Sequence, residues 1–210
     1  MHIPDGILPA AVTVAGYATA AGATALTIRN YRREDIPRAS LLTAAFFVAS
    51  WIHIPIPPTS VHLVLNGLMG VVLGPMAFPA ILIGLFFQAV IFQHGGLTSL
   101  GVNATMMGLP ALLGYGIFQL RRLFGNGNRT STAVFAFLGG ALGLGVAALI
   151  ALILLVTTIP TYMDVAAERA SIITLTLAHA PLMIIEGIFT ALVVLFLLRV
   201  KPEMLGDHAS

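Results

Sequence analysis

Long stretches of this 210-residue chain contain no charged residue: none occurs between Arg38 and Arg121. Only 9% of the residues are charged, whereas 58% are hydrophobic. Soluble domains carry roughly a quarter charged residues, and one membrane crossing takes about 20 apolar residues. The sequence therefore predicts an all-α integral membrane protein of the inner or plasma membrane, with one membrane-embedded domain over residues 1–210.

Apolar runs predict seven crossings of the membrane. The predicted spans cover residues 7–28, 39–55, 60–74, 76–93, 104–120, 132–157 and 176–198. Span 60–74 is short for a full crossing, and only Gly74 and Pro75 separate it from the next span. These two spans could therefore be tilted, broken or re-entrant.

Nine of the ten basic residues lie in alternate connections. They are Arg29, Arg32, Arg33 and Arg38 after the first span, Arg121, Arg122 and Arg129 after the fifth, and Arg199 and Lys201 after the seventh. Short loops that carry Lys and Arg stay in the cytoplasm. The N-terminus is therefore expected outside and the C-terminus inside, with a cytoplasmic tail over 201–210.

This topology places five of the six histidines at or near the outer face. They are His2, His53, His62, His94 and His179, whereas His208 lies in the tail. A single His near an interface often serves as a hydrogen-bonding anchor, but the gathering of several favours a metal site. The chain has no cysteine, so the ligands must be nitrogen or oxygen atoms.

The first two residues form the sharpest candidate ligand set. The start Met-His-Ile-Pro-Asp-Gly lacks a basic n-region, and no long apolar region with a cleavage site follows, so Met1 is expected to persist. Its amine, the His2 amide nitrogen and the His2 ring Nδ1 could chelate one ion, with a preference for Ni²⁺, Cu²⁺ or low-spin Co²⁺. Residues 1–6 are the expected metal-binding segment; the alternative is a disordered terminus.

His62 is the candidate for the fourth nitrogen. It opens a predicted span, and Asn66, one helical turn later, would share its face and orient the ligand or the metal. The run Ile-Pro-Ile-Pro-Pro-Thr-Ser over 54–60 cannot continue a helix and is expected to form a rigid extended turn.

The segment from His94 to Asn103, with the sequence HGGLTSLGVN, is too polar for exposure to lipid. Such backbone is tolerated at membrane depth only where it is buried in protein or lines a cavity. We expect a loop folded over the outer pocket, with His94 and Asn103 as lid residues or supports of the ligands. A simple solvated loop is the alternative.

An intramembrane carboxylate, Glu186, follows His179 by seven residues, so the two share one helix face. They could line a conducting path, or Glu186 could be a protonated structural hydrogen-bonding group. On the first span, small residues recur at four-residue spacing, which allows close packing within the chain or against another subunit. They are Ala11, Ala15, Gly16, Ala20, Ala21, Thr24 and Ala25.

Several motifs are absent from the sequence. It has no G-x-x-x-x-G-K-[ST] phosphate loop, no H-E-x-x-H and no G-x-S-x-G. The chain is therefore not expected to be an enzyme, to power transport with its own ATP hydrolysis, to hold a cofactor or to bind nucleic acid.

Three ordered motifs, MHIPDG at the start, PPTSVHLVLNGL over 57–68 and HGGLTSLGVN over 94–103, resemble the CbiM/NikM family. These proteins are the substrate-capture components of energy-coupling factor transporters for Co²⁺ and Ni²⁺. The resemblance implies seven helices and an N-terminus folded back into an outer pocket, with Met1, His2 and His62 as the ligands. Both family branches share this chelate, so Ni²⁺ and Co²⁺ both stay open.

The resemblance also implies partners: a transmembrane coupling protein, a pair of cytoplasmic ATPases and a small accessory membrane protein of the CbiN or NikN type, which is not expected to be fused here. The loaded component would tilt in the lipid membrane as ATP is hydrolysed, with the alanines of the first span as the coupling face. The rival hypothesis is a self-sufficient secondary permease that couples metal to protons through Glu186 and His179.

Overall fold

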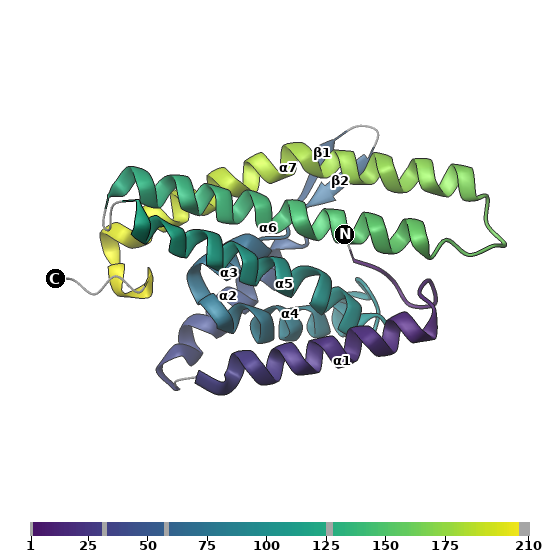
Figure 1. Cartoon of the computed structure of the whole chain (residues 1–210), viewed down its shortest axis with the longest axis horizontal. Helices are drawn as coiled ribbons and strands as arrows, with labels where there is room; N and C mark the ends of the chain where they lie inside the picture. Colours follow the sequence, from purple (N-terminus) through teal and green to yellow (C-terminus); the bar gives the residue numbers. More distant parts are fainter. Residues whose placement is uncertain (1, 31–32, 57–58, 125–127, 206–210) are drawn as a thin grey trace.

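The computed structural model describes residues 2–30, 33–56, 59–124 and 128–205. Most of the described residues form helices that run along the long axis of the molecule (Figure 1). The all-α prediction is therefore confirmed apart from one small hairpin. The helices are α1 (Ala10–Thr27), α2 (Ile36–Ala49), α3 (Asn66–Leu73), α4 (Ala77–Phe92), α5 (Leu100–Gln119), α6 (Arg129–Thr157) and α7 (Val165–Val200).

Among the described residues, five helical segments are long and apolar enough to cross a membrane, as expected of a multi-pass membrane protein. They are Ala10–Thr27, Asn66–Phe92, Leu100–Leu123, Arg129–Thr157 and Val165–Val200. The predicted count of seven crossings is not confirmed. Helix α2 has 14 residues, about 21 Å at 1.5 Å per residue, which is less than the roughly 30 Å of a bilayer core. Helices α3 and α4 follow each other through the short turn Gly74–Met76 as one segment.

A two-stranded antiparallel hairpin stands where helix was predicted at the ends of spans 39–55 and 60–74. Strand β1 (His53–Ile56) pairs with β2 (Thr59–His62), with His53 opposite His62. Pro55 has no N–H to donate, which opposes a helix but is tolerated in a two-stranded ribbon. The helical prediction was therefore wrong here, while the expected extended backbone over 54–60 agrees with the hairpin except at 57–58, which lie outside the described residues.

Helix α3 is the centre of the fold, since all eight of its residues are buried. Its glycines bring it into backbone contact with its neighbours: a Cβ added at Gly70 would lie 1.8 Å from the carbonyl oxygen of Ala111 on α5. A Cβ added at Gly67 would lie 2.6 Å from the carbonyl oxygens of Gly139 and Gly140 on α6. Small residues permit this approach between membrane helices, and we call these residues the glycine contact.

The small-residue face of α1 packs partly inside the chain. Gly16 and Ala20 are buried, and a Cβ at Gly16 would collide with Val102 of α5. Ala11 and Ala25 on the same helix are exposed. The face therefore serves packing within the chain at its centre and is open to lipid or another protein elsewhere.

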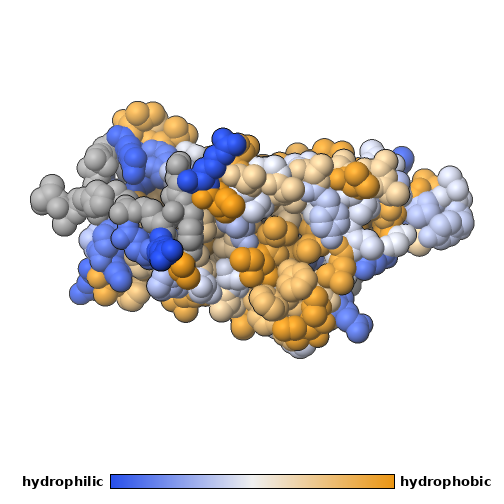
Figure 2. All heavy atoms as spheres, turned by 90° about the horizontal axis from the view of Figure 1, so that it is seen from below, coloured by the Kyte–Doolittle hydropathy of each residue, from blue (hydrophilic) through white to orange (hydrophobic). Residues whose placement is uncertain are grey.

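The ends of α1, α5 and α7 lie together at one end of the bundle (Figure 1), and they carry Arg29, Arg121, Arg122 and Arg199, whereas Arg169 lies near the start of α7. Hydrophilic side chains gather at this end, and hydrophobic ones cover the middle of the face in Figure 2. Arg38 donates to the carbonyl of Met204 at 2.9 Å, and Arg121 donates to that of Leu205 at 3.0 Å. The short turn Pro202–Leu205, at the start of the predicted tail, is therefore bound to the bundle.

Candidate metal centre

His2, His62 and His94 bring ring nitrogens to within 4.8 Å of one another. The ring centroids lie 5.1 Å apart for His2 and His62, 4.2 Å for His2 and His94, and 5.0 Å for His62 and His94. Two nitrogens bound to one metal at about 2.0–2.1 Å can be about 4.2 Å apart at most. Small ring movements would therefore let all three bind one ion.

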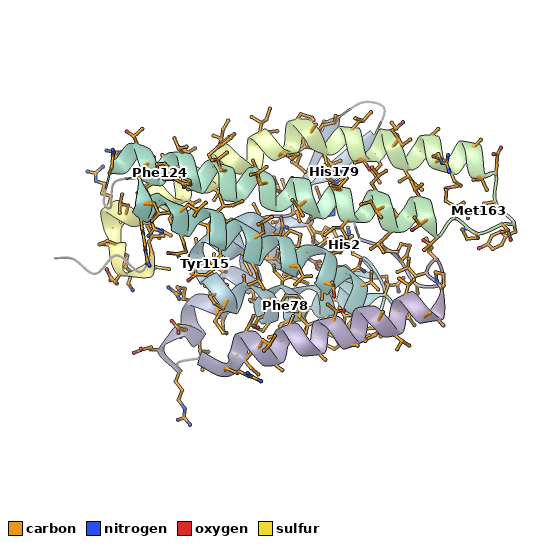
Figure 3. The ribbon with its side chains drawn as sticks, in the orientation of Figure 1. His2, Phe78, Tyr115, Phe124, Met163 and His179 are labelled. Atoms are coloured by element: carbon orange, nitrogen blue, oxygen red, sulfur yellow. The ribbon has the colours of Figure 1, made fainter. Side chains whose placement is uncertain are left out.

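The N-terminal segment reaches this cluster by folding back along the helix bundle. Figure 3 shows His2 near the middle of the bundle. The residue after His2 is clamped by Asn103: the Ile3 N–H donates to Oδ1, and Nδ2 donates to the Ile3 carbonyl, each at 2.9 Å. The Ser99 hydroxyl donates to the same carbonyl at 2.6 Å. Asn103, expected as a lid or support, thus contacts the backbone beside His2.

Asp5 fixes the same segment further along and was missed by the sequence reasoning. Its carboxylate accepts the backbone N–H groups of Leu97, Thr98 and Ser99 at 3.1, 2.9 and 3.2 Å, and the Thr98 hydroxyl at 2.6 Å. These hydrogen bonds, the Thr98 hydroxyl first, lower the pKa of Asp5. The segment predicted as a lid is therefore bound to the N-terminus at these residues and is not simply solvated.

His94 is aimed at the cluster by the turn that ends α4. Gln93 adopts a left-handed conformation with φ 53°, and the His94 N–H donates to the carbonyl of Gln88 at 3.1 Å. Gly95 follows with φ 89°. The His94 ring lies closer to His2 than His62 does, so His94 belongs among the candidate ligands and not only to a lid.

His62 ends β2 and is 6% exposed. Its Nδ1 lies 2.9 Å from the carbonyl oxygen of Leu63. Because a carbonyl only accepts, Nδ1 carries the proton and Nε2 carries the lone pair in the neutral ring. The helical turn expected between His62 and Asn66 is not formed. Instead, Asn66 donates to the carbonyls of Met107 and Gly143 at 3.3 and 3.0 Å, joining α3 to α5 and α6.

His179 and Glu186, the two residues predicted to line a conducting path, are both buried on α7, and both form hydrogen bonds with backbone groups. His179 donates from Nδ1 to the Leu175 carbonyl at 2.7 Å, and Glu186 accepts from the N–H groups of Val64 and Leu65. A cavity of about 70 Å³ is lined by both His179 and His2, together with side chains of α6 and α7.

The remaining predicted residues lie apart from the cluster or cannot be placed. The His53 ring is exposed on β1, with its centroid 6.0 Å from that of His62. Met1 and His208 lie outside the described residues.

Burial keeps the clustered imidazoles neutral. It lowers the pKa of His2 well below its ordinary value, that of His62 to about 3, and that of His94. Neither ring nitrogen of His2 has a hydrogen-bond partner among the described residues, although both atoms are buried. Neutral imidazole is the form that binds transition metals, so the cluster is chemically ready for a cation.

A cavity of about 210 Å³ lies between the N-terminal segment and the end of α6, the start of α7 and the residues that join them. It is lined by His2, Pro4, Thr158, Tyr162 and Glu168, among others. A larger apolar groove of about 500 Å³ lies between α2 and α4 and includes none of the three histidines. Of these two cavities, the smaller one is lined by a residue of the cluster, His2.

Known proteins share this architecture. Residues 2–204 match the family model CbiM, the cobalt uptake substrate-specific transmembrane region. A Haemophilus influenzae protein named for metal transport is 33% identical over 98% of this chain and 97% of its own length. The cobalt transport protein CbiM of Sorangium cellulosum is 30% identical over 98% and 94%.

Two further likenesses extend the comparison. The fused nickel transport protein NikMN of Rhodobacter capsulatus is 30% identical over the whole chain, which spans 65% of that longer protein. A crystal structure of a transition metal transporter superposes with a TM-score of 0.79 and 26% identity, covering 96% of this chain and 94% of its own. These relatives are named as transport proteins, in keeping with a non-enzymatic role. By its sequence and its architecture, the chain belongs to the CbiM family.

Proposed function

We propose that this chain is the substrate-capture component of an ATP-driven energy-coupling factor importer for Ni²⁺ or Co²⁺. The observation that carries the proposal is the His2 ring: its two nitrogens are buried without a hydrogen-bond partner among the described residues, and they lie close to two further imidazoles. A segment that is clamped at Ile3 and Asp5 holds this ring in place. Such an anchored, neutral nitrogen cluster suits capture of a transition-metal ion.

The proposed ligands are the amine of Met1, the amide nitrogen and ring of His2, and the ring of His62, with His94 close enough to contribute. Among the residues that the structure describes, the cluster contains no carboxylate. Oxygen ligands are what Ca²⁺ and Mg²⁺ require, whereas imidazole and amide nitrogens favour Ni²⁺, Co²⁺ and Cu²⁺. The names of the relatives, which include both cobalt and nickel transport, support the same pair of metals.

The proposed partners are a transmembrane coupling protein, a pair of ATPases and a NikN-type accessory protein. The fused NikMN relative supports the last of these, because its additional length goes with a name that combines two components. The exposed alanines of α1 offer a surface on which a transmembrane partner could pack closely.

We favour this function over a self-sufficient proton-coupled permease because His179 and Glu186 are both occupied by backbone hydrogen bonds. The two functions differ in what powers uptake. Radioactive ⁶³Ni²⁺ uptake in cells should require the ATPase pair. Uptake that is abolished by a protonophore and survives loss of the ATPases would instead establish the permease.

The chelate is tested by inserting one alanine between Met1 and His2. The insertion moves the amine away from the His2 amide and ring, so high-affinity binding of Ni²⁺ and Co²⁺ should be lost by calorimetry while the fold is retained. His208→Ala, in the tail, is the control that should leave binding unchanged. Unaltered affinities in the insertion variant would overturn the chelate, and titrations with Cu²⁺ and Zn²⁺ would define its selectivity.

A further inference from the structure

One peptide group lies between a buried carboxylate and a candidate metal ligand. The N–H of Val64 donates to Oε1 of Glu186, and the carbonyl of Leu63, the other half of the same peptide, accepts the Nδ1–H of His62 at 2.9 Å. Glu186 on α7 is therefore connected to His62 through the Leu63–Val64 peptide, although the two residues are far apart in the sequence.

The geometry of the peptide group makes this connection directional. A trans peptide is planar, and its N–H and C=O point in opposite directions. A carboxylate that holds the N–H on one side consequently fixes where the C=O points on the other. Hydrogen bonds in series also polarise one another in a low-dielectric interior, so the carboxylate strengthens the carbonyl as an acceptor for the His62 ring.

The second oxygen of Glu186 secures the same turn. It accepts the N–H of Leu65 at 2.9 Å, and Leu65 adopts a left-handed conformation with φ 56° directly before α3. Glu186 is 0% exposed, and both of its oxygens are used by backbone donors. This occupancy fits a positioning group rather than a station on a conducting path.

We propose that Glu186 is a positioning residue for metal capture. By holding the Leu63–Val64 peptide, it keeps the His62 ring in the tautomer that presents the Nε2 lone pair and in the orientation that faces His2 and His94. Metal-binding histidines commonly donate their other ring N–H to a carboxylate or a carbonyl, and here the carbonyl is itself held by a carboxylate. The inference rests on the proposed function, because it takes His62 as a ligand.

The first test is Glu186→Gln, which keeps the shape of the side chain but retains only one oxygen to accept the two N–H groups. We expect Ni²⁺ affinity to fall by about 10- to 100-fold by calorimetry, with a shifted Ni²⁺ absorption band because His62 is held differently. Thr190→Val is the matched control: it alters a buried polar group, 1% exposed, one turn further along α7 and should change neither readout. Glu186→Asp, which keeps the charge, should recover part of the affinity.

A double-mutant cycle separates positioning from general support of the fold. In a His62→Ala background, Glu186→Gln should cause no further loss of Ni²⁺ affinity, because its effect passes through the missing ring. An additional loss of the same size as in the wild-type background would overturn the inference, as would wild-type affinity and absorption in Glu186→Gln alone. If wild-type protein binds no Ni²⁺ or Co²⁺, or if His62→Ala binds normally, the failure is that of the proposed ligand set instead.

Discussion

The histidine cluster and the glycine contact adjoin each other at the start of α3 but are built by opposite means. Around the histidines, irregular backbone is held by polar side chains: Asn103 clamps Ile3, and Asp5 binds the turn before α5. In the glycine contact, the helices pack backbone against backbone because the glycines have no side chains to keep them apart. The polar clamps therefore set the positions of the candidate ligands, whereas the glycines set the positions of the helices.

The largest expected effect comes from filling the glycine contact. In Gly70→Ala, the new methyl group meets the backbone of α5, which cannot rotate away as a side chain could. We therefore expect the free energy of unfolding to fall by about 1–3 kcal/mol or more. The thermal unfolding midpoint and metal binding should decline together. Gly22→Ala on α1 is the matched control, since a Cβ there meets nothing within 4 Å. Equal midpoints for the two variants would contradict the close approach of α3 and α5.

Removing a polar clamp should affect the other side of the comparison. Asn103→Ala releases the backbone beside His2, so Ni²⁺ affinity should fall by about 10- to 100-fold in calorimetry. Asn128→Ala removes the N-cap of α6, whose side chain accepts from the Thr130 N–H, and should cost about 1 kcal/mol of stability without lowering affinity. A loss of affinity in both variants would mean that the cluster depends on overall stability alone.

The contribution of His94 can be measured against that of His53. The His94 ring lies 4.2 Å from His2, whereas His53 is exposed on the hairpin. His94→Ala should lower Ni²⁺ affinity by about 10-fold, an effect typical of a lost metal-supporting group. His53→Ala should leave affinity unchanged. The reverse order would place the ion nearer the hairpin than the N-terminal segment.

The smallest effect is a dependence of apo stability on pH. Burial lowers the pKa of His62 to about 3 in the folded protein, whereas an unfolded His titrates near 6.5. Between these values the unfolded chain binds more protons, so stability is complete above about pH 6.5 and declines as the pH falls below it. In His62→Gln, the thermal midpoint measured without metal should fall less between pH 7 and pH 5. Parallel curves for both proteins would show that His62 stays accessible to protons.

Much of this molecule was predictable because the signals are local. Long apolar runs predicted the helices, and His2 and His62, which the structure brings together, stood out as candidate ligands because the chain has few other groups that bind metals. The crossings were harder to predict. The predicted spans ran into residues 53–56 and 59–62, whereas Pro55 opposes a helix there and the two segments pair as a hairpin.

The parts that were missed depend on contacts between distant segments. Nothing near Asp5 in the sequence indicates that its carboxylate binds the turn before α5. The left-handed residues Gln93 and Leu65, which direct His94 and begin α3, are not glycines and carry no sequence signal. Glu186 was recognised as unusual, but its partners on the turn after β2 could be known only from the fold.

The clamp between Ile3 and Asn103 joins residues 100 positions apart, which has a consequence for how the protein is made. The segment around Ile3 cannot dock until α5 has been synthesised and packed, because Asn103 and Ser99, which bind Ile3, do not exist earlier. Closing so large a loop is slow and entropically costly. The proposed capture site is therefore completed only after α5 is in place, and an affinity tag attached to the amine of Met1 should produce a well-folded protein that does not bind Ni²⁺ or Co²⁺ with high affinity.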